Sequence, residues 1–372
     1  MTAPTLTLAP SDLTSLSGLV DVVGERAARV DTGEVDVRPS LRDLGRVGFL
    51  GLGLPTETRR PGSVVATPVP ATDTVGTLAD QAEVIRCLAR VCTATAFSVW
   101  AHRTAAGYLA SWGSDELRAE LLPDLLAGRR TAATAMATAF QAALGLRELS
   151  VTAHRDGDDV VLDGTIPWAS NLFADGAVVV LAARTDEGRN LIVAITTDQR
   201  GVALRDQPEL LALDATASTT VRLDGVRVPA HRVLTDRFLD FLADVRPAFL
   251  LLQTALCLGL ADAALTAAAR RLEGTTAILT EDHDALLGRR GALDAVFQRR
   301  LTEPAPADDE LVRLRLEASQ LAVAVTRHEA TATGGAGYLA SSATARRLRE
   351  AAFLPIQSPT EAQLRWELSR SV

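Results

Sequence analysis

The chain has 372 residues, of which 47% are hydrophobic and 23% are charged, a balance typical of a globular protein with two or three structural units. Its net charge of -8, without any basic run, argues against a nucleic-acid partner. The five histidines are scattered and the three cysteines form no CxxC pair, so we expect buried thiols and no metal centre. The N-terminus lacks a basic segment before an apolar core, and the longest apolar stretches are too short or too interrupted to span a bilayer. We therefore expect a cytoplasmic protein without a membrane partner.

The first third of the chain has helical patterns. Residues 11–28 begin with a capping serine and have apolar spacing near the helical period, and residues 77–112 form a long alanine-rich stretch. Gly113 then ends this helix, and Ser114, followed by acidic residues, begins another. We predict an N-terminal α-helical domain over residues 1–128.

The pattern changes from helix to strand near residue 131. Short runs of alternating or β-branched apolar residues recur with polar turns between them, which predicts a small sandwich or barrel. We assign this β-domain to residues 129–235. The predicted strands are 149–154 and 160–162, joined by a hairpin turn at 155–158, and then 177–183, 191–196 and 219–228.

Helical spacing returns after the predicted strands. Three amphipathic or apolar stretches cover residues 238–271, 285–300 and 309–332. We predict a C-terminal four-helix bundle domain over residues 236–372. The fold class is then α+β, with a helical, a β and a second helical domain in chain order.

Four segments carry recognisable motifs in order along the chain: Trp112–Leu117 with Leu121–Gly128, Gly164–Asn171, Leu223–Pro229, and Gly334–Tyr338 with Arg346–Glu350. Together they resemble the acyl-CoA dehydrogenase superfamily. The second segment is similar to the family's G.K.WitN strand, the third to its F.dv.VP exit from the β-domain, and the fourth to GG.GY…R..RD. The resemblance covers the whole chain and implies the fold of that family.

The resemblance also implies a flavin site. Trp168 and the hydroxyl residue Ser170 match residues that lie against the flavin ring in the family. Gly334 and Gly335 permit the close backbone approach that a dinucleotide needs. Because the family's flavin site borrows this segment from a neighbouring subunit, a homodimer or homotetramer is expected. On the residues alone, the glycine pair fits a helix C-cap, and Trp168 fits a core aromatic residue, at least as well.

Other flavin motifs are only partly preserved. The family's MTEP.AGSD loop corresponds to Met136–Leu144, where Met136, Thr138 and backbone N–H groups remain to contact the cofactor. Thr360 matches the threonine of the family's I.EGT motif. The R..FG motif, which meets the FAD pyrophosphate, has no clear counterpart after Arg271. We therefore expect FAD or FMN, held loosely or supplied in reduced form by a partner flavin reductase.

The catalytic base of the family's dehydrogenases is missing from its usual positions. Its glutamate falls on Ser358, and a neutral serine cannot accept an α-proton without a neighbouring base. The alternative position, on the first helix of the C-terminal domain, holds Phe249. Asp244, about one turn away, and Glu361, three residues after Ser358, are the carboxylates that could replace the lost base.

Three functions remain open. The first, which we favour, is a flavin-dependent monooxygenase that uses reduced flavin and oxygen on a small organic or carrier-bound substrate, because such enzymes need no α-proton base. His102, on the helix that walls the family's substrate cavity, would bind the reactive oxygen or a phenol-like substrate. A helix histidine can equally cap or face solvent. The second function is an acyl-CoA or acyl-carrier-protein dehydrogenase with Asp244 or Glu361 as a displaced base. The third is a non-catalytic paralogue that binds a ligand or a partner.

Overall fold

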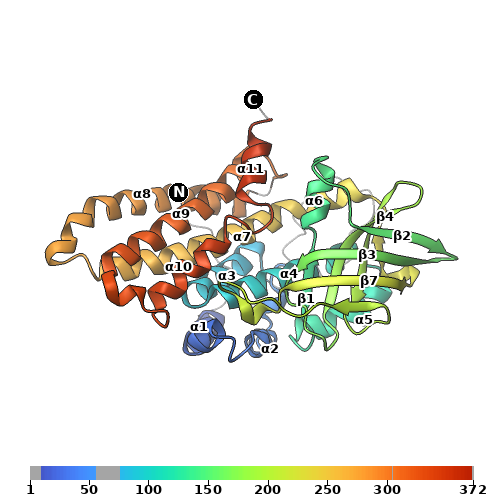
Figure 1. Ribbon diagram of the computed structural model, residues 1–372, viewed down its shortest axis with the longest axis horizontal. Helices are drawn as coiled ribbons and strands as arrows, with labels where there is room; N and C mark the ends of the chain where they lie inside the picture. Colours follow the sequence, from blue (N-terminus) through green and yellow to red (C-terminus); the bar gives the residue numbers. More distant parts are fainter. Residues whose placement is uncertain (1–9, 56–75, 304, 371–372) are drawn as a thin grey trace.

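The N-terminal part of the protein is helical. A computed structural model describes residues 10–55, 76–303 and 305–370 (Figure 1). The first residues of the chain, on which the predicted localisation depends, lie outside this part. The helices are α1 (Pro10–Asp31), α2 (Arg38–Arg46), α3 (Leu78–Val91), α4 (Thr93–Trp112) and α5 (Asp115–Leu126).

One predicted helix is divided in two. We expected a continuous helix over residues 77–112, but Cys92 has extended backbone angles, φ -157° and ψ 103°, so that α3 ends before it and α4 begins after it. Its Sγ accepts a hydrogen bond from the Thr95 N–H at 3.5 Å, as an N-capping side chain does. The sequence hides this break because alanine-rich segments on both sides favour helix throughout.

The central part of the chain forms one mixed sheet of eight strands. Their order is β6-β7-β3-β2-β4-β5-β8, and β1 pairs in parallel with β4. Strands β1, β6 and β8 were not predicted, because each has only three or four residues. The strands are β1 (Ala132–Ala135), β2 (Val151–Asp156), β3 (Asp159–Ala169), β4 (Val178–Thr185), β5 (Asn190–Thr196), β6 (Val202–Leu204), β7 (Thr219–Val228) and β8 (Val233–Thr235).

Strand β4 is buried on both faces, which explains its continuous apolar sequence. Successive side chains of a strand point to opposite faces of the sheet. One set packs into the main core with the helices, and the other packs into a separate core formed by the sheet itself. The first set is Val178, Val180 and Ala182, and the second is Val179, Leu181 and Ala183.

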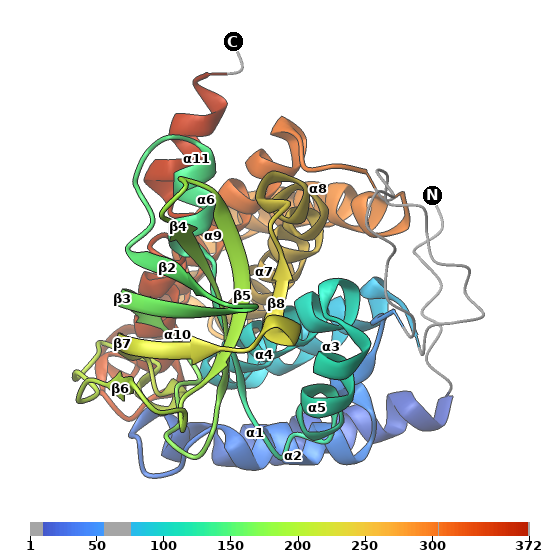
Figure 2. The same cartoon turned by 90° about the vertical axis from the view of Figure 1, so that its right-hand side faces the viewer.

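The C-terminal part returns to helices, of which α7 is the longest described. It contacts α3 and α4 as well as α8 and α9, so it joins the two helical parts into one core (Figures 1 and 2). Strand gives way to helix between Thr235 and Phe238, close to the predicted boundary. The helices are α7 (Phe238–Ala269), α8 (Thr280–Thr302), α9 (Asp309–Thr333), α10 (Ala343–Phe353) and α11 (Glu361–Leu368).

The length of α7 corrects one expectation from the sequence. Among the described residues it is the one helix long and apolar enough to cross a membrane, with a mean hydropathy of 1.8 in its most apolar window. However, 83% of that window is buried inside the protein. An apolar helix of this kind is the central helix of a large core.

Asn171, immediately after β3, connects three elements. Its side-chain Nδ2 donates to the backbone oxygen of Ser98 in α4 at 2.9 Å and to that of Ala132 in β1 at 3.0 Å. The Ser98 hydroxyl donates back to Asn171 Oδ1. The residue is fully buried and has a left-handed φ of 64°, a conformation that asparagine tolerates better than most residues. Asn171 therefore sets where the end of β3 lies relative to α4.

Substitution of Asn171 should separate its two contributions to stability. Asn171→Gly keeps the left-handed backbone but removes the hydrogen bonds to two buried carbonyls and the acceptor of the buried Ser98 hydroxyl, which should cost on the order of 2–4 kcal/mol in the free energy of unfolding. Asn171→Ala should cost about 1 kcal/mol more, because alanine is strained at this φ. Urea unfolding measures both. Asn190→Ala, at the half-buried start of β5, is the control and should change stability little. Equal stability of the Gly and Ala variants would contradict the backbone argument.

Candidate functional site

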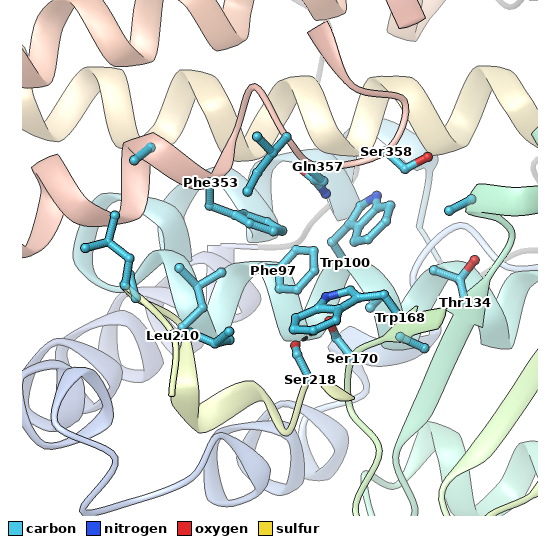
Figure 3. A pocket seen from close by; sticks show the side chains of 18 of the residues that line it. Phe97, Trp100, Thr134, Trp168, Ser170, Leu210, Ser218, Phe353, Gln357 and Ser358 are labelled. Carbon is cyan, nitrogen blue, oxygen red and sulfur yellow. Dashed lines mark hydrogen bonds between the residues drawn. The ribbon is translucent and has the colours of Figure 1, made fainter. Parts of the chain in front are cut away.

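A cavity of about 440 Å³ opens where the N-terminal helices, the sheet and the C-terminal helices meet (Figure 3). Helix α4 contributes Phe97 and Trp100, the end of β3 contributes Trp168 and Ser170, and the segment after α10 contributes Ser358. The volume lies within the range of small-molecule sites. Elements far apart in the sequence thus converge on one space, which makes it the candidate functional site.

Four aromatic side chains, Phe97, Trp100, Phe249 and Phe353, form one side of the cavity, which we call the aromatic wall. Phe97 stacks on Trp100 with ring centroids 5.4 Å apart, and Phe353 meets Phe97 edge-on at 4.8 Å. Trp100 meets Phe249 edge-on at 5.0 Å and donates its indole N–H to the backbone oxygen of Phe249 at 3.3 Å. These mutual contacts fix the rings and give this side of the cavity an apolar surface.

Trp168 lies across the cavity from the segment that carries Gln357 and Ser358. Figure 3 shows its indole beneath Phe97 and Trp100, with Gln357 and Ser358 above them. Its side chain is 45% exposed although it lines the cavity. A large aromatic face that nothing in the described chain covers is suited to a flat ligand.

Ser170 ends a chain of hydroxyl groups with a fixed direction. Thr216 Oγ1 donates to the backbone oxygen of Leu213 at 2.8 Å, which uses its only proton. Ser218, 2.8 Å from Thr216 Oγ1, must then donate to it. Ser170, 2.7 Å from Ser218 Oγ, must in turn donate to Ser218. Ser170 is therefore left with lone pairs alone, and it can only accept a further hydrogen bond from a ligand.

The described residues that line the cavity include no aspartate, glutamate or histidine. Ser358, which the motif resemblance aligns with the family's glutamate, does line it, and its Oγ is buried without a hydrogen-bond partner among the described residues. Arg349 is the charged side chain of this described lining, and it is ion-paired with Asp31. None of these groups can accept an α-proton at neutral pH.

His102 lies outside the cavity lining, and its predicted catalytic role is revised to a structural one. The fully buried ring accepts a hydrogen bond at Nδ1 from the Ala132 N–H at 3.1 Å. Its Nε2 then carries the proton and donates to the backbone oxygen of Leu125 at 3.0 Å. Burial lowers the pKa of His102 to about 4. The neutral ring thus ties α4 to the end of α5 and the start of β1.

The two carboxylates that could have replaced the missing base have other partners, which corrects the role predicted for Asp244. Asp244 Oδ2 accepts a hydrogen bond from the indole N–H of Trp112 at 2.9 Å, and Asp244 is not part of the cavity lining. Glu361 accepts hydrogen bonds from Gln320 at 3.0 Å and from Arg365 at 2.8 Å, and the one from Gln320 is the main reason its pKa is lowered. It does not line the cavity either.

Of the three residues predicted from partly preserved cofactor motifs, only Met136 reaches the cavity, where its side chain is 1% exposed. The expected loop folds instead as α6 (Ala137–Ala143), and Thr138 on this helix is outside the lining. Thr360 caps α11, since its hydroxyl accepts a hydrogen bond from the Gln363 N–H at 3.2 Å.

The glycine-rich segment belongs to a different part of the surface. Gly334 and Gly335 are exposed at the start of a 3₁₀ turn, Gly334–Tyr338, and Gly334 has a left-handed φ of 66°. The same segment borders a second depression of about 390 Å³. Its arginines give it the chemistry to hold an anionic group such as a phosphate. The charged residues in its lining are Arg270, Arg271, Arg347 and Glu329.

The cavity residues that were not predicted from the sequence include Trp100, Ser218 and Gln357. Trp100 lies on the helix expected to wall the cavity, two positions before His102 and thus about 200° away around the helix. Nearly every residue of α4 is buried, so its sequence has no polar face that shows the direction. Gln357 is next to Ser358 in the I.EGT-like stretch, and that position was the available signal. We find no local pattern that would have indicated Ser218.

Comparisons with known proteins agree with this geometry. A family model described as acyl-CoA dehydrogenase, N-terminal domain, matches residues 19–129. The probable acyl-CoA dehydrogenase YngJ of Bacillus subtilis (strain 168) is 24% identical over 373 residues, which cover 94% of this chain and 93% of that protein. The prolyl acyl carrier protein oxidase AnaB has a TM-score of 0.80 at 19% identity, covering 98% of both chains. A glutaryl-CoA dehydrogenase from Mycobacterium smegmatis in complex with FADH2 has a TM-score of 0.81 at 18% identity, covering 98% of this chain and 95% of that chain. The structural likenesses show a shared fold.

The buried His102 should make the protein sensitive to acid. Its pKa is about 4 in the folded state against 6.5 as the ordinary value, so its stabilising effect is complete above pH 6.5 and is lost as the pH falls toward 4. The loss should be on the order of 3 kcal/mol in the free energy of unfolding. Urea unfolding of His102→Gln should therefore show a shallower pH dependence than the wild type.

His154→Gln provides the opposite control. His154 is exposed, and its hydrogen bond with Asp186 raises its pKa, so it adds stability on the acid side. Its removal should make the pH dependence steeper. If the His102 variant and the wild type lose stability equally between neutral and acid pH, the buried neutral ring is not the cause.

Proposed function

We propose that this chain, a member of the acyl-CoA dehydrogenase superfamily, is a flavin-dependent oxidoreductase that binds FAD and acts as a monooxygenase. It would use reduced flavin and oxygen on a small organic or carrier-bound substrate. The observation that carries this proposal is the cavity, whose described lining offers no carboxylate or histidine. Abstraction of an α-proton, which acyl-CoA dehydrogenation requires, has no base there.

The cavity fits the ring system of a flavin. Its volume of about 440 Å³, the open indole of Trp168 and the aromatic wall suit a flat, mostly apolar group. Bound FAD would supply the electrons and the place where oxygen is activated. The chain itself would supply the dry surroundings that such chemistry needs. A glutaryl-CoA dehydrogenase of the same fold has been solved in complex with FADH2.

Ser170 favours the reduced form of the cofactor. The reduced flavin ring carries a proton on N5 and can donate a hydrogen bond there, whereas the oxidised ring can only accept one. Because the hydroxyl chain through Ser218 leaves Ser170 as an acceptor, a flavin N–H would find a partner and an unprotonated nitrogen would not. A site that prefers reduced flavin suits an enzyme supplied by a flavin reductase.

The phosphate arm of FAD would bind at the glycine-rich depression, which Arg270 and Arg271 border. This depression and the cavity are separate, so one cofactor would need both sites brought together by a second copy of the chain. We therefore retain the homodimer or homotetramer as part of the proposal. Exposed apolar side chains such as Tyr338, which is 90% exposed, lie in the same segment.

Ser358→Glu should convert the site toward dehydrogenation. The new carboxylate would face the cavity at the position of the family's base, and a positioned base contributes roughly 10²–10⁴-fold to proton removal. We expect FAD-loaded wild type to keep its oxidised-flavin absorbance when mixed anaerobically with acyl-CoA thioesters of increasing chain length. The variant should bleach with at least one of them.

Ser358→Gln is the matched control, since it has the same size as the glutamate without a basic oxygen. Anaerobic bleaching of wild-type flavin by an acyl-CoA would contradict the proposal and support a dehydrogenase with a displaced base. Oxygen consumption that requires an added flavin reductase would support it. Absence of flavin binding in either redox state would leave a non-catalytic role.

Ser218→Ala should weaken the preference for reduced flavin. Without Ser218 as an acceptor, the Ser170 proton becomes available to the oxidised ring. One hydrogen bond of about 1 kcal/mol corresponds to a fall of about 20 mV in a two-electron reduction potential. Spectroelectrochemical titration of the bound FAD measures the shift. Ser150→Ala, on the exposed face of the sheet, should leave the potential unchanged. A shift to higher potential would contradict the direction of the chain.

A further inference from the structure

Arg315 in α9 is a fully buried cation with no carboxylate partner among the described residues. Its Nε donates to Gln253 Oε1 at 2.8 Å, and its Nη2 donates to the backbone oxygen of Leu354 at 3.1 Å. Its Nη1 has no hydrogen-bond partner in the described chain. Leu354 follows the last residue of α10, so the negative end of this helix offsets part of the charge. The remainder has no counter-charge in the surroundings that the structure describes.

Arg315 fixes two cavity residues. Its Nη2 also donates to Gln357 Oε1 at 3.3 Å, which sets the orientation of that side-chain amide. Gln253, held by Arg315, donates through its Nε2 to the backbone oxygen of Ser358 at 2.9 Å. Gln357 and Ser358 therefore form a supported segment at the cavity, above Trp100 in Figure 3.

The free polar atoms of this segment are both hydrogen-bond donors. Gln357 is 4% exposed, and its Nε2 is buried without a partner among the described residues. The Oγ of Ser358 is also buried and has no hydrogen-bond partner among the described residues. Leaving buried donors unpaired costs free energy, so ligand acceptor atoms that reach these two groups would gain hydrogen bonds that the described chain does not supply. A ligand oxygen that carries negative charge would gain further from the buried guanidinium behind them.

We propose that Gln357 Nε2 and Ser358 Oγ, backed by Arg315, form a binding subsite for an anionic oxygen of the substrate, such as the carboxylate or phenolate of an aromatic acid. The aromatic part would lie against Trp100 and Phe353 of the aromatic wall. A dehydrogenase site has a proton acceptor at this place. Here the place is occupied by two hydrogen-bond donors, with the Arg315 cation behind them. This inference names the substrate class for the proposed function and rests on the same cavity serving as its substrate site.

The alternative is that Arg315 only holds the loop after α10 in place. Both roles predict that loss of Arg315 destabilises the fold, so the test leaves Arg315 unchanged. Ser358→Ala removes one donor, and Gln357→Leu removes the other together with the side-chain oxygen that accepts from Arg315. Both variants keep the buried cation. Gln357→Glu places a negative charge beside Arg315 with almost no change in size.

Isothermal titration calorimetry with FAD-saturated protein tests the subsite with three probes that share one ring: benzoate, benzamide and benzylammonium. We expect the wild type to bind benzoate at least about tenfold more tightly than benzylammonium, with benzamide between them. Gln357→Leu and Ser358→Ala should each weaken benzoate about tenfold, and Gln357→Glu should weaken it more and should not weaken benzylammonium. Thr138→Val, which removes a hydroxyl outside the cavity lining, should keep the wild-type affinities.

Equal binding of benzoate and benzylammonium, unchanged benzoate affinity in Gln357→Leu, or no binding of benzoate in the millimolar range would each overturn the subsite. The measurement involves no turnover, so its failure is distinct from failure of the proposed function. If the protein binds benzoate selectively but never consumes oxygen, the proposed subsite is supported and the proposed monooxygenase function is contradicted.

Discussion

The side-chain amide of Asn171 is the contact on which the geometry of the cavity depends. It bridges the backbone of α4 and that of β1 from the first turn after β3, while its own left-handed backbone redirects the chain. Trp168 and Ser170 lie just before this point and the aromatic wall begins on α4, so one residue sets the distance between the two sides of the cavity. A hydrogen-bonded polar residue at such a junction specifies one arrangement, because any shift leaves buried backbone oxygens unpaired.

The fold shared with solved acyl-CoA dehydrogenases carries a cavity without an acidic side chain in its described lining. Phe249 and Ser358 occupy the two positions to which the motif resemblance assigns an acid. Behind Ser358 lies the buried Arg315, which holds this segment through Gln357 and Gln253. The same backbone position can therefore serve two functions. With a carboxylate side chain it accepts a proton, and with a donor side chain it binds a negatively charged oxygen.

The sequence predicts the order of elements and the residues that motifs locate, but not the direction in which helices face. Trp168 and Ser358 lie at the cavity because short motifs tie each to a fixed place on the fold. His102 was predicted on the correct helix, but its side chain lies on the side away from the cavity. Trp100 of the same helix faces the cavity instead. Helix α4 is buried all around, so periodicity carries no information about its orientation. Thr138 was misplaced because a short helix replaced the expected loop, a choice decided by tertiary packing.

The chain has two methionines, and one of them, Met136, is part of the cavity lining with 1% of its surface exposed. Two of the three thiols, Cys92 and Cys257, are buried with raised pKa values, which keeps them protonated and unreactive. Because Met136 is almost fully buried, bulk oxidants reach it poorly, whereas under the proposed function an oxidant would form in the cavity that this residue borders. The sulfoxide content of the peptide that carries Met136, read by mass spectrometry in the absence of methionine sulfoxide reductases, would then record how often activated oxygen had escaped its substrate.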